Sequence, residues 1–574
     1  MSIVNIRQNR TEILANEFAN NSNIQVVNLP DTITTIKTHA FKNCENLRII
    51  NLSDSITEIE YGAFEECVNL RFITLPKHLQ HISDNVFCKS GIVKITIPDG
   101  VITIGSKAFC GCKHLTEVKL NDKLETIGAN AFSLCDNLLE LYIPDSVTRI
   151  YPSAFCFCRN LQRIHLPSKI EEIPDNTFAD CNSLNNVKIP DGVIGISDHA
   201  FAHCCCLTDI DIPRSIRYIS NHAFYACNAL EQITIPPGVE TIKSYTFKSC
   251  VNLKKVTLPE HVSTIEKSAF ENCLNLKNIN LESIVRIEAE AFKNCASLET
   301  IDLKQINTID GNAFEKCSSL HTATIEGTLY SLSHKVFLQC ENLKNVTLHQ
   351  YTEAIGDSCF EDCYSLEEIK LPESLMTFPR NLFKNCINLR SVDMSNTNSK
   401  VSISHDIFEN CQKLETVILP DGLDYIYSGF IKNIETLKHL FIRSYDIMQI
   451  NLSPRSPRTL TSYSELLAII SDFKDPNITR RIRDGMAAIL YNNTKDKHAG
   501  NYIKKHPVEI FETLTKDNDI SAIRSILSEK PDFITADNID TMIDNARINS
   551  KLEIQVTLTR YKHDNFNAAA PLQL

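Results

Sequence analysis

Cysteine is the residue type in this chain that could most readily do chemistry, because 22 occur and several stand close together. The closest groups are Cys110-x-Cys112, Cys156-x-Cys158 and Cys204-Cys205-Cys206. Thiolates at such spacing could bind zinc. However, one member of each group belongs to a set of 16 cysteines that recur at one repeat position, and no C-x-x-C pair or organised His cluster accompanies them. We therefore expect no metal ion and no cofactor.

The other residues capable of catalysis are scattered. The 17 histidines fall on repeat positions expected to face solvent, such as His165, His199, His222 and His334. Glu367 and Glu368 are neighbours on an expected strand, so they do not form an acid/base pair. The phosphate-binding, dinucleotide-binding, nucleophile-elbow and zinc-protease motifs are all absent. The sequence predicts a protein that is not an enzyme.

The element that positions all these residues is a repeat marked by phenylalanine. Along most of the chain a Phe returns every 22 or 23 residues, with a single step of 25 before Phe408. The series is Phe18, Phe41, Phe64, Phe87, Phe109, Phe132, Phe155, Phe178, Phe201, Phe224, Phe247, Phe270, Phe292, Phe314, Phe337, Phe360, Phe383, Phe408 and Phe430. Such a period is the signature of a solenoid, in which each unit buries its apolar face only against its neighbours.

One unit, from Ile127 to Val147, shows the pattern. Ile127 precedes Phe132 by five residues, and Cys135 and Leu138 follow it at three and six. The L-x-x-I-x-L stretch that comes next alternates apolar and polar residues, which predicts a strand. The spacing of three around the Phe predicts a short helical or 3₁₀ return. Each unit is thus expected to hold one parallel strand and one return, with Cys filling a small apolar slot.

This pattern, I-x-x-x-A-F-x-x-C-x-x-L-x-x-I-x-L-P, resembles the leucine-rich repeats of the BspA or Treponema pallidum type. Good matches begin at Ile127 and at Ile219, and the resemblance extends from about residue 13 to 443. It implies an α/β repeat solenoid: a leucine-rich-repeat arc with a parallel strand ladder and short helical or 3₁₀ returns. We assign residues 1–450 to this solenoid, with about 18 repeats. Many members of the resembling family are bacterial proteins that are anchored at the cell surface or secreted.

A different pattern follows the repeats. Residues 451–463 are rich in Ser, Pro and Arg and are expected to form a linker. Residues 464–574 show helical spacing, with expected helices that hold Leu466 to Ile470, Ile482 to Leu490, and Ile520 to Leu527 after Asp519. Two more are expected after Asp537 and around Leu558. This small all-α domain is similar to degenerate ankyrin repeats, and it would serve either as a cap on the solenoid or as a second binding module.

Charge and thiol content bear on partners and compartment. The net charge of −12 indicates no basic surface of the kind that binds nucleic acid. Lys254, Lys255 and Lys277 are expected to form a solvated face. No apolar run is long enough to span a membrane. Many unpaired thiols favour a reducing compartment, and residues 1–10 lack the features of a signal peptide. We expect a cytoplasmic protein, with secretion or surface display by a non-classical route as the alternative.

Binding is expected on the strands. The seventh, eighth and tenth positions after each Phe would point outward on the concave side, and they vary in size and charge. Within them the candidate protein-binding face is Tyr142, Arg163, His165, Lys188 and Asp211. We expect a non-catalytic scaffold that binds a protein partner through this face. The alternatives are an adhesin that binds host or matrix proteins and, from another class, an enzyme whose chemistry lies in the helical tail.

Overall fold

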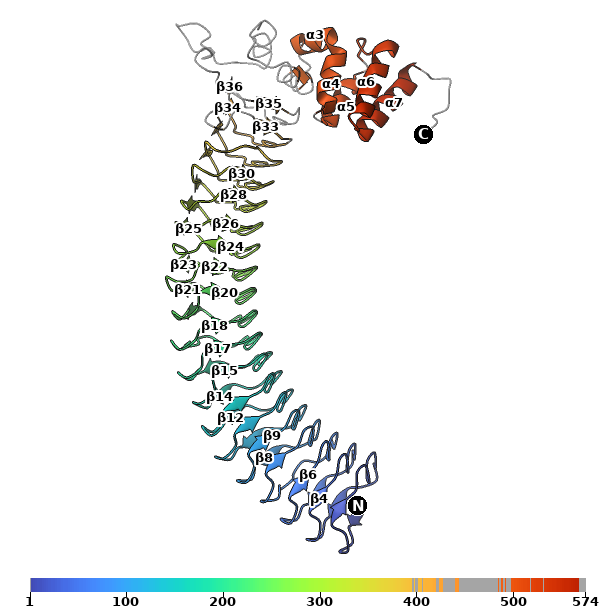
Figure 1. The fold of residues 1–574 in the computed structure, drawn as a ribbon, viewed down its shortest axis with the longest axis vertical. Coiled ribbons are helices and arrows are strands. Elements are labelled where there is room, and N and C mark those ends of the chain that lie inside the picture. The colour runs from blue at the N-terminus through green and yellow to red at the C-terminus, as the bar shows by residue number, and fades with distance from the viewer. Residues whose placement is uncertain are drawn as a thin grey trace. The chain divides into compact units, whose positions relative to one another are not determined.

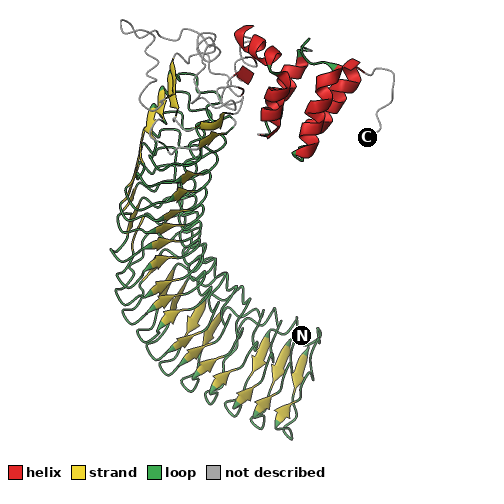
Figure 2. Ribbon diagram, turned by 45° about the horizontal axis from the view of Figure 1, so that its top comes forward, coloured by secondary structure: helices red, strands yellow, loops and turns green. Residues whose placement is uncertain are grey.

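The computed structural model describes residues 2–394, 397, 401–404, 406–419, 423–426, 439–442, 484, 487–488, 491, 497–516, 518–529 and 531–566. It divides into two compact units, residues 1–298 and 299–574. In both units short parallel strands stack turn upon turn (Figures 1 and 2). The chain is an α/β repeat solenoid of about 18 turns, with five helices among the described residues of its C-terminal part.

The expected strands form a first parallel ladder in each unit. In unit 1 they are β1 Ile3–Asn5, β3 Val26–Asn28, β5 Ile49–Asn51, β8 Lys94–Thr96, β10 Glu117–Lys119, β12 Glu140–Tyr142, β14 Arg163–His165, β16 Asn186–Val187, β19 Gln232–Thr234, β21 Lys255–Thr257 and β23 Asn278–Ile279. In unit 2 they are β25 Thr300–Leu303, β27 Thr322–Ile325, β29 Asn345–Thr347, β31 Glu368–Lys370, β32 Ser391–Asp393, β34 Thr416–Leu419 and β36 His439–Ile442. Partners such as Glu140 and Arg163 are one repeat apart.

Most turns also contain a second strand, usually of two residues, that the sequence pattern did not predict. In unit 1 these are β2 Glu12–Ile13, β4 Thr35–Ile36, β6 Glu58–Ile59, β7 His81–Ile82, β9 Thr103–Ile104, β11 Thr126–Ile127, β13 Arg149–Ile150, β15 Glu172–Ile173, β17 Gly195–Ile196, β18 Tyr218–Ile219, β20 Thr241–Ile242, β22 Thr264–Ile265 and β24 Arg286–Ile287. In unit 2 they are β26 Thr308–Ile309, β28 Ser331–Leu332, β30 Ala354–Ile355, β33 Val401–Ile403 and β35 Leu423–Ile426. The recurring Thr-Ile pair, β-branched at both positions, was the available signal.

The phenylalanines form a stacked column inside each unit. From Phe41 to Phe292 every ring of the series is fully buried. Successive rings in unit 1 lie 5.1–5.7 Å apart and nearly parallel. This spacing is that of offset-stacked aromatic pairs, which gain energy beyond the area that they bury. The predicted aromatic spine is confirmed.

The recurring cysteines are both buried and hydrogen-bonded. These thiols donate to the carbonyl oxygen of a Phe one repeat earlier than their own, as Cys204 does to Phe178 at 3.3 Å and Cys227 to Phe201 at 3.1 Å. The slot therefore requires a small side chain that can donate to a carbonyl. Cysteine meets both needs, because it packs as a compact hydrophobe and carries a weak S–H donor.

The returns consist of successive tight turns instead of a helix. The residues two before and two after each Phe have positive φ, such as Asn176 (55°) and Asp180 (59°) around Phe178. Backbone N–H groups therefore alternate in direction. Those of Ala179 and Cys181 bond within the turn, whereas those of Phe178 and Asp180 bond to the next repeat. An α-helix directs its N–H groups along its own axis, so it could not form these bonds between repeats.

Replacing Asn176 by valine is expected to lower the free energy of unfolding by about 1–2 kcal/mol, because a β-branched residue is strained in the left-handed region. Urea unfolding monitored by circular dichroism measures the change. Asn176→Gly is the matched control, since glycine adopts positive φ without this strain. Equal stability of the valine and glycine variants would contradict the expectation.

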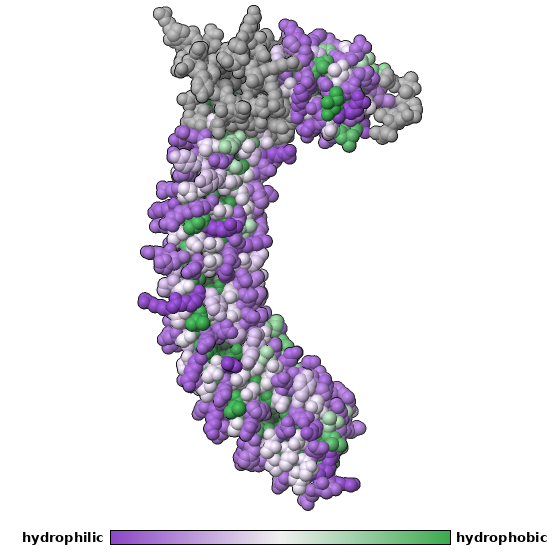
Figure 3. Space-filling model, in the orientation of Figure 1, coloured by the Kyte–Doolittle hydropathy of each residue, from purple (hydrophilic) through white to green (hydrophobic). Residues whose placement is uncertain are grey.

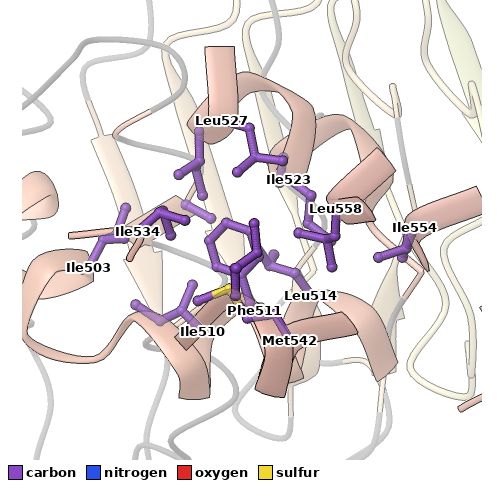
Figure 4. Packing of buried hydrophobic residues seen from close by; sticks show 14 of the residues in the cluster. Ile503, Ile510, Phe511, Leu514, Ile523, Leu527, Ile534, Met542, Ile554 and Leu558 are labelled. Atoms are coloured by element: carbon purple, nitrogen blue, oxygen red, sulfur yellow. The ribbon is translucent and has the colours of Figure 1, made fainter. Parts of the chain in front are cut away.

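The C-terminal helices are α3 Lys497–Lys505, α4 Pro507–Lys516, α5 Ile520–Ser528, α6 Ala536–Ile548 and α7 Leu552–Phe566. They share one apolar core, in which Phe511 and Leu514 of α4 pack with Met542 of α6 and Leu558 of α7 (Figure 4). Asp519 caps α5 by accepting a hydrogen bond from the Ala522 N–H, as its sequence position indicates. The predicted helices after Asp519, after Asp537 and around Leu558 are confirmed.

Several expectations fall outside the described residues. These are Phe430, the linker at 451–463, the helix at Leu466 to Ile470 and most of the helix at Ile482 to Leu490. The boundaries of the linker and of the helical domain therefore stay predictions, as do its ankyrin-like character and its role as cap or binding module. Among the described helices, none has both the length and the apolar content of a membrane span.

Candidate protein-binding face

Around β12 and β14 of unit 1, the outward positions of the first ladder expose polar and aromatic side chains. On β12, Leu141 is buried while Tyr142 is 60 % exposed. The same alternation on β14 buries Ile164 and exposes Arg163 and His165. Because the strands are parallel and in register, side chains at one repeat position line up along the stack. In both units the visible surface is mostly hydrophilic with small apolar patches (Figure 3).

Tyr142 and His165 form the most anchor-like feature of this surface. They are direct partners across β12 and β14, and their ring centroids lie 4.5 Å apart with an angle of 7° between the planes. Stacking holds both side chains in place before any partner arrives. Such a pre-ordered aromatic side chain loses little conformational entropy on binding.

Arg163 lies beside this pair and is held by a carboxylate. Its Nη2 is 3.2 Å from Oε2 of Glu140, and both side chains are largely exposed. An ion pair in such a position contributes little to stability. Its guanidinium therefore stays available to a carboxylate of a binding partner.

Lys188 and Asp211 continue the column of Tyr142 and His165. Lys188 follows the end of β16, and it forms an isolated parallel bridge with Asp211 of the next turn. Both side chains are exposed. The structure thus places all five predicted residues on one face over four successive turns.

A groove of about 770 Å³ crosses this face, and the sequence pattern did not reveal it. Its lining comprises Thr116, Glu117, Val118, Leu139, Glu140, Leu141, Tyr142, Gln162, Arg163, Ile164 and His165. Leu139 is 49 % exposed and adds an apolar side chain to the same groove as Tyr142. Leu139 occupies the seventh position after Phe132, so the repeat register gave the signal for it.

Histidine placement differs from expectation at two positions. His165 and His334 are exposed as expected, but His199 and His222 are half-buried. Their rings stack at 4.3 Å, and His222 stacks on Tyr245 at 4.6 Å. Burial, followed by the charges of His199 and Lys248, lowers the pKa of His222. These side chains lie at the left-handed positions of the returns, whose packing the strand pattern does not describe.

The cysteine clusters show no arrangement for metal binding. Cys112, Cys158 and Cys204 are buried members of the thiol column, and all 22 cysteines are free thiols. Within the described residues no group of three or more His, Cys, Asp or Glu side chains could hold a metal ion. Burial raises the pKa of Cys250 to about 12, so this thiol stays protonated and can donate its hydrogen bond.

One thiol differs from the rest. Cys110 is partly exposed, and a hydrogen bond with the thiol of Cys88 lowers its pKa to about 7. The thiolate is the reactive form of cysteine, so Cys110 should react with a thiol reagent faster than the buried cysteines of the column do.

One family model matches most of this chain, and several solved structures are similar to it. The model of the BspA type leucine rich repeat region matches residues 1–116, 80–205, 195–321 and 330–453. A leucine-rich repeat protein from Bacteroides ovatus is 25 % identical with a TM-score of 0.44, over 73 % of this chain and 92 % of that one. The T. pallidum leucine rich repeat protein is 26 % identical with a TM-score of 0.22, over 36 % and 78 %. No curated protein matches the sequence.

Proposed function

Because the chain belongs to the BspA-type leucine-rich repeat family, we propose that it is a non-catalytic scaffold that binds a protein partner through the strand face centred on Tyr142, Arg163 and His165. The observation that carries this proposal is the stacked, largely exposed Tyr142–His165 pair beside an exposed arginine. Tyr and Arg dominate the binding energy of protein interfaces. Leu139 supplies an apolar neighbour in the same groove.

The charges of this face indicate the chemistry of the partner. Arg163 is paired with Glu140, and Lys188 is followed by Asp211 in the next turn. Mixed charges around an aromatic centre favour a partner surface that also carries both signs, since complementary charges select the partner and fix its register. A nucleic acid would need a largely basic face instead.

Replacing Tyr142 by alanine is expected to weaken partner binding about 10- to 100-fold, the loss typical of an interface anchor. The partner is first captured with the intact chain, and its affinity is then measured by calorimetry. Tyr330→Ala is the matched control, because Tyr330 is 64 % exposed but does not belong to this face. Unchanged affinity of the Tyr142 variant, or equal losses in both variants, would refute the proposal.

We also propose that the protein works in a reducing compartment. The thiol column supports this, because cysteines such as Cys204 and Cys227 donate their S–H to a backbone carbonyl and an oxidised sulfur cannot do so. Cell fractionation combined with alkylation of free thiols before lysis tests the proposal. Recovery of the protein outside the cell, with oxidised cysteines, would favour the adhesin alternative.

A further inference from the structure

A second exposed surface lies on the first turns of unit 1, away from the Tyr142 groove. One column of the strand face there is apolar in four successive turns, at Ile3, Val26, Ile49 and Phe72, which we call the N-terminal stripe. Val26 is buried, at 9 % exposure, and the other three members face outward. Each member pairs directly with the next across parallel strands. Ile3, Ile49 and Phe72 are 53 %, 42 % and 67 % exposed. Burying these three side chains would release water from apolar surface, most of it on the neighbouring pair Ile49 and Phe72.

The stripe is specific to these turns. The next positions of the same column are Lys94, Glu117, Glu140 and Arg163, all charged. Isolated apolar residues are ordinary on a protein surface, whereas a contiguous set marks an interaction site. Three strand spacings of roughly 4.8 Å give the stripe a length of about 15 Å, which about five extended residues would span.

Two arginines flank the stripe on one side. Arg48 and Arg71 immediately precede Ile49 and Phe72. Within the described residues, no carboxylate lies within ion-pair distance of either guanidinium, although Nη1 of Arg71 donates to the Gly91 carbonyl oxygen at 3.3 Å. The outward positions of these four turns carry no acidic residue in a chain whose net charge is −12. The local charge therefore favours an acidic ligand.

Amide side chains flank the stripe on the other side. Asn28 Nδ2 donates to Asn5 Oδ1 and Asn51 Nδ2 donates to Asn28 Oδ1, each at 2.8 Å. This chain of hydrogen bonds orders the amides along the stack. The exposed members at its ends can still accept from or donate to the backbone of a bound peptide.

We propose that the N-terminal stripe binds an extended acidic segment of a partner protein that presents both apolar side chains and carboxylates on the face toward the stripe. The apolar side chains cover Ile3, Ile49 and Phe72, and the carboxylates pair with Arg48 and Arg71. The proposal shares the strand face with the proposed function but uses different residues. Loss of binding at one surface can therefore be distinguished from loss at the other.

The test uses the full chain and a fluorescein-labelled peptide of about ten residues, a length that covers the stripe. Its odd-numbered positions alternate between Phe or Ile and Asp, so both kinds of side chain lie on one face of the extended peptide. Fluorescence anisotropy measures its affinity. Phe72→Ala is expected to weaken binding about tenfold or more, and so is the double variant Arg48→Glu, Arg71→Glu. Tyr330→Ala is the matched control and should leave this affinity unchanged, because Tyr330 is exposed but belongs to neither surface. Added salt should weaken binding, because exposed charges are screened.

Each alternative ligand of the stripe would give a different binding result. Equal binding of a peptide with Lys in place of Asp would remove the assigned role of the arginines and overturn the proposal. So would absence of binding up to about 1 mM peptide, the limit of weak association. Tighter binding of single-stranded DNA than of the acidic peptide would also overturn it. Concentration-dependent dimerisation that Phe72→Ala abolishes would assign the stripe to a second copy of the chain instead.

Discussion

Replacing Phe201 by alanine is expected to lower the free energy of unfolding by about 3–5 kcal/mol, the range for buried phenylalanines. Phe201 has no exposed surface, and its ring stacks on Phe178 at 5.4 Å and on Phe224 at 5.5 Å. Alanine would leave a cavity between two rings that backbone hydrogen bonds hold in place. Urea unfolding measures the global change, and hydrogen exchange should show faster opening of the turns beside residue 201.

The control for this variant is Phe72→Ala, the same substitution on an exposed ring. Phe72 is 67 % exposed, so its loss should change the unfolding free energy by less than about 1 kcal/mol. Similar destabilisation by both variants would mean that the phenylalanine column is not the core of the stack.

Thiol accessibility should differ sharply between the folded and unfolded chain. Of the 22 cysteines, only Cys206 is exposed, and Cys110 and Cys205 are partly exposed. A thiol reagent should therefore modify these three in the native protein and all 22 in denaturant. Cys110 should react at lower pH than an ordinary thiol, because the Cys88 hydrogen bond lowers its pKa to about 7.

Variants identify the reacting residues. Cys206→Ser should reduce the native count by one, whereas Cys227→Ser should leave it unchanged because that thiol is buried. Fast modification of most of the 22 thiols in the native state would contradict the buried column.

The repeat register was predictable because each core side chain packs against a residue of the same type at the equivalent position of the next turn. The spacing around Phe132 placed Leu141 inside and Tyr142 outside, as the structure shows. The outward placement of the five residues of the candidate face was predictable for the same reason, since one register fixes every outward position. The helix at Ile520 followed from a local signal, the Asp519 cap.

Other features depend on contacts between turns and could not be derived from one repeat. The sequence indicates that a small, weakly polar residue is needed at Cys204. Predicting its hydrogen bond to the Phe178 carbonyl requires knowing which carbonyl of the neighbouring turn lies next to the thiol. Most strands of the second ladder are only two residues long, which is too short for a period-two pattern to appear. The left-handed residues were missed because Asn, His and Leu all occupy them, as at Asn176, His222 and Leu134.

Site-specific photo-crosslinking tests whether the strand face around Tyr142 binds a protein partner, as we propose. A photoreactive phenylalanine analogue replaces Tyr142 in one variant and Tyr330 in another, since both side chains are exposed by 60 % or more. We predict a crosslink to one discrete partner from position 142 and none from position 330. A partner captured equally from both positions, or only from position 330, would contradict the claim.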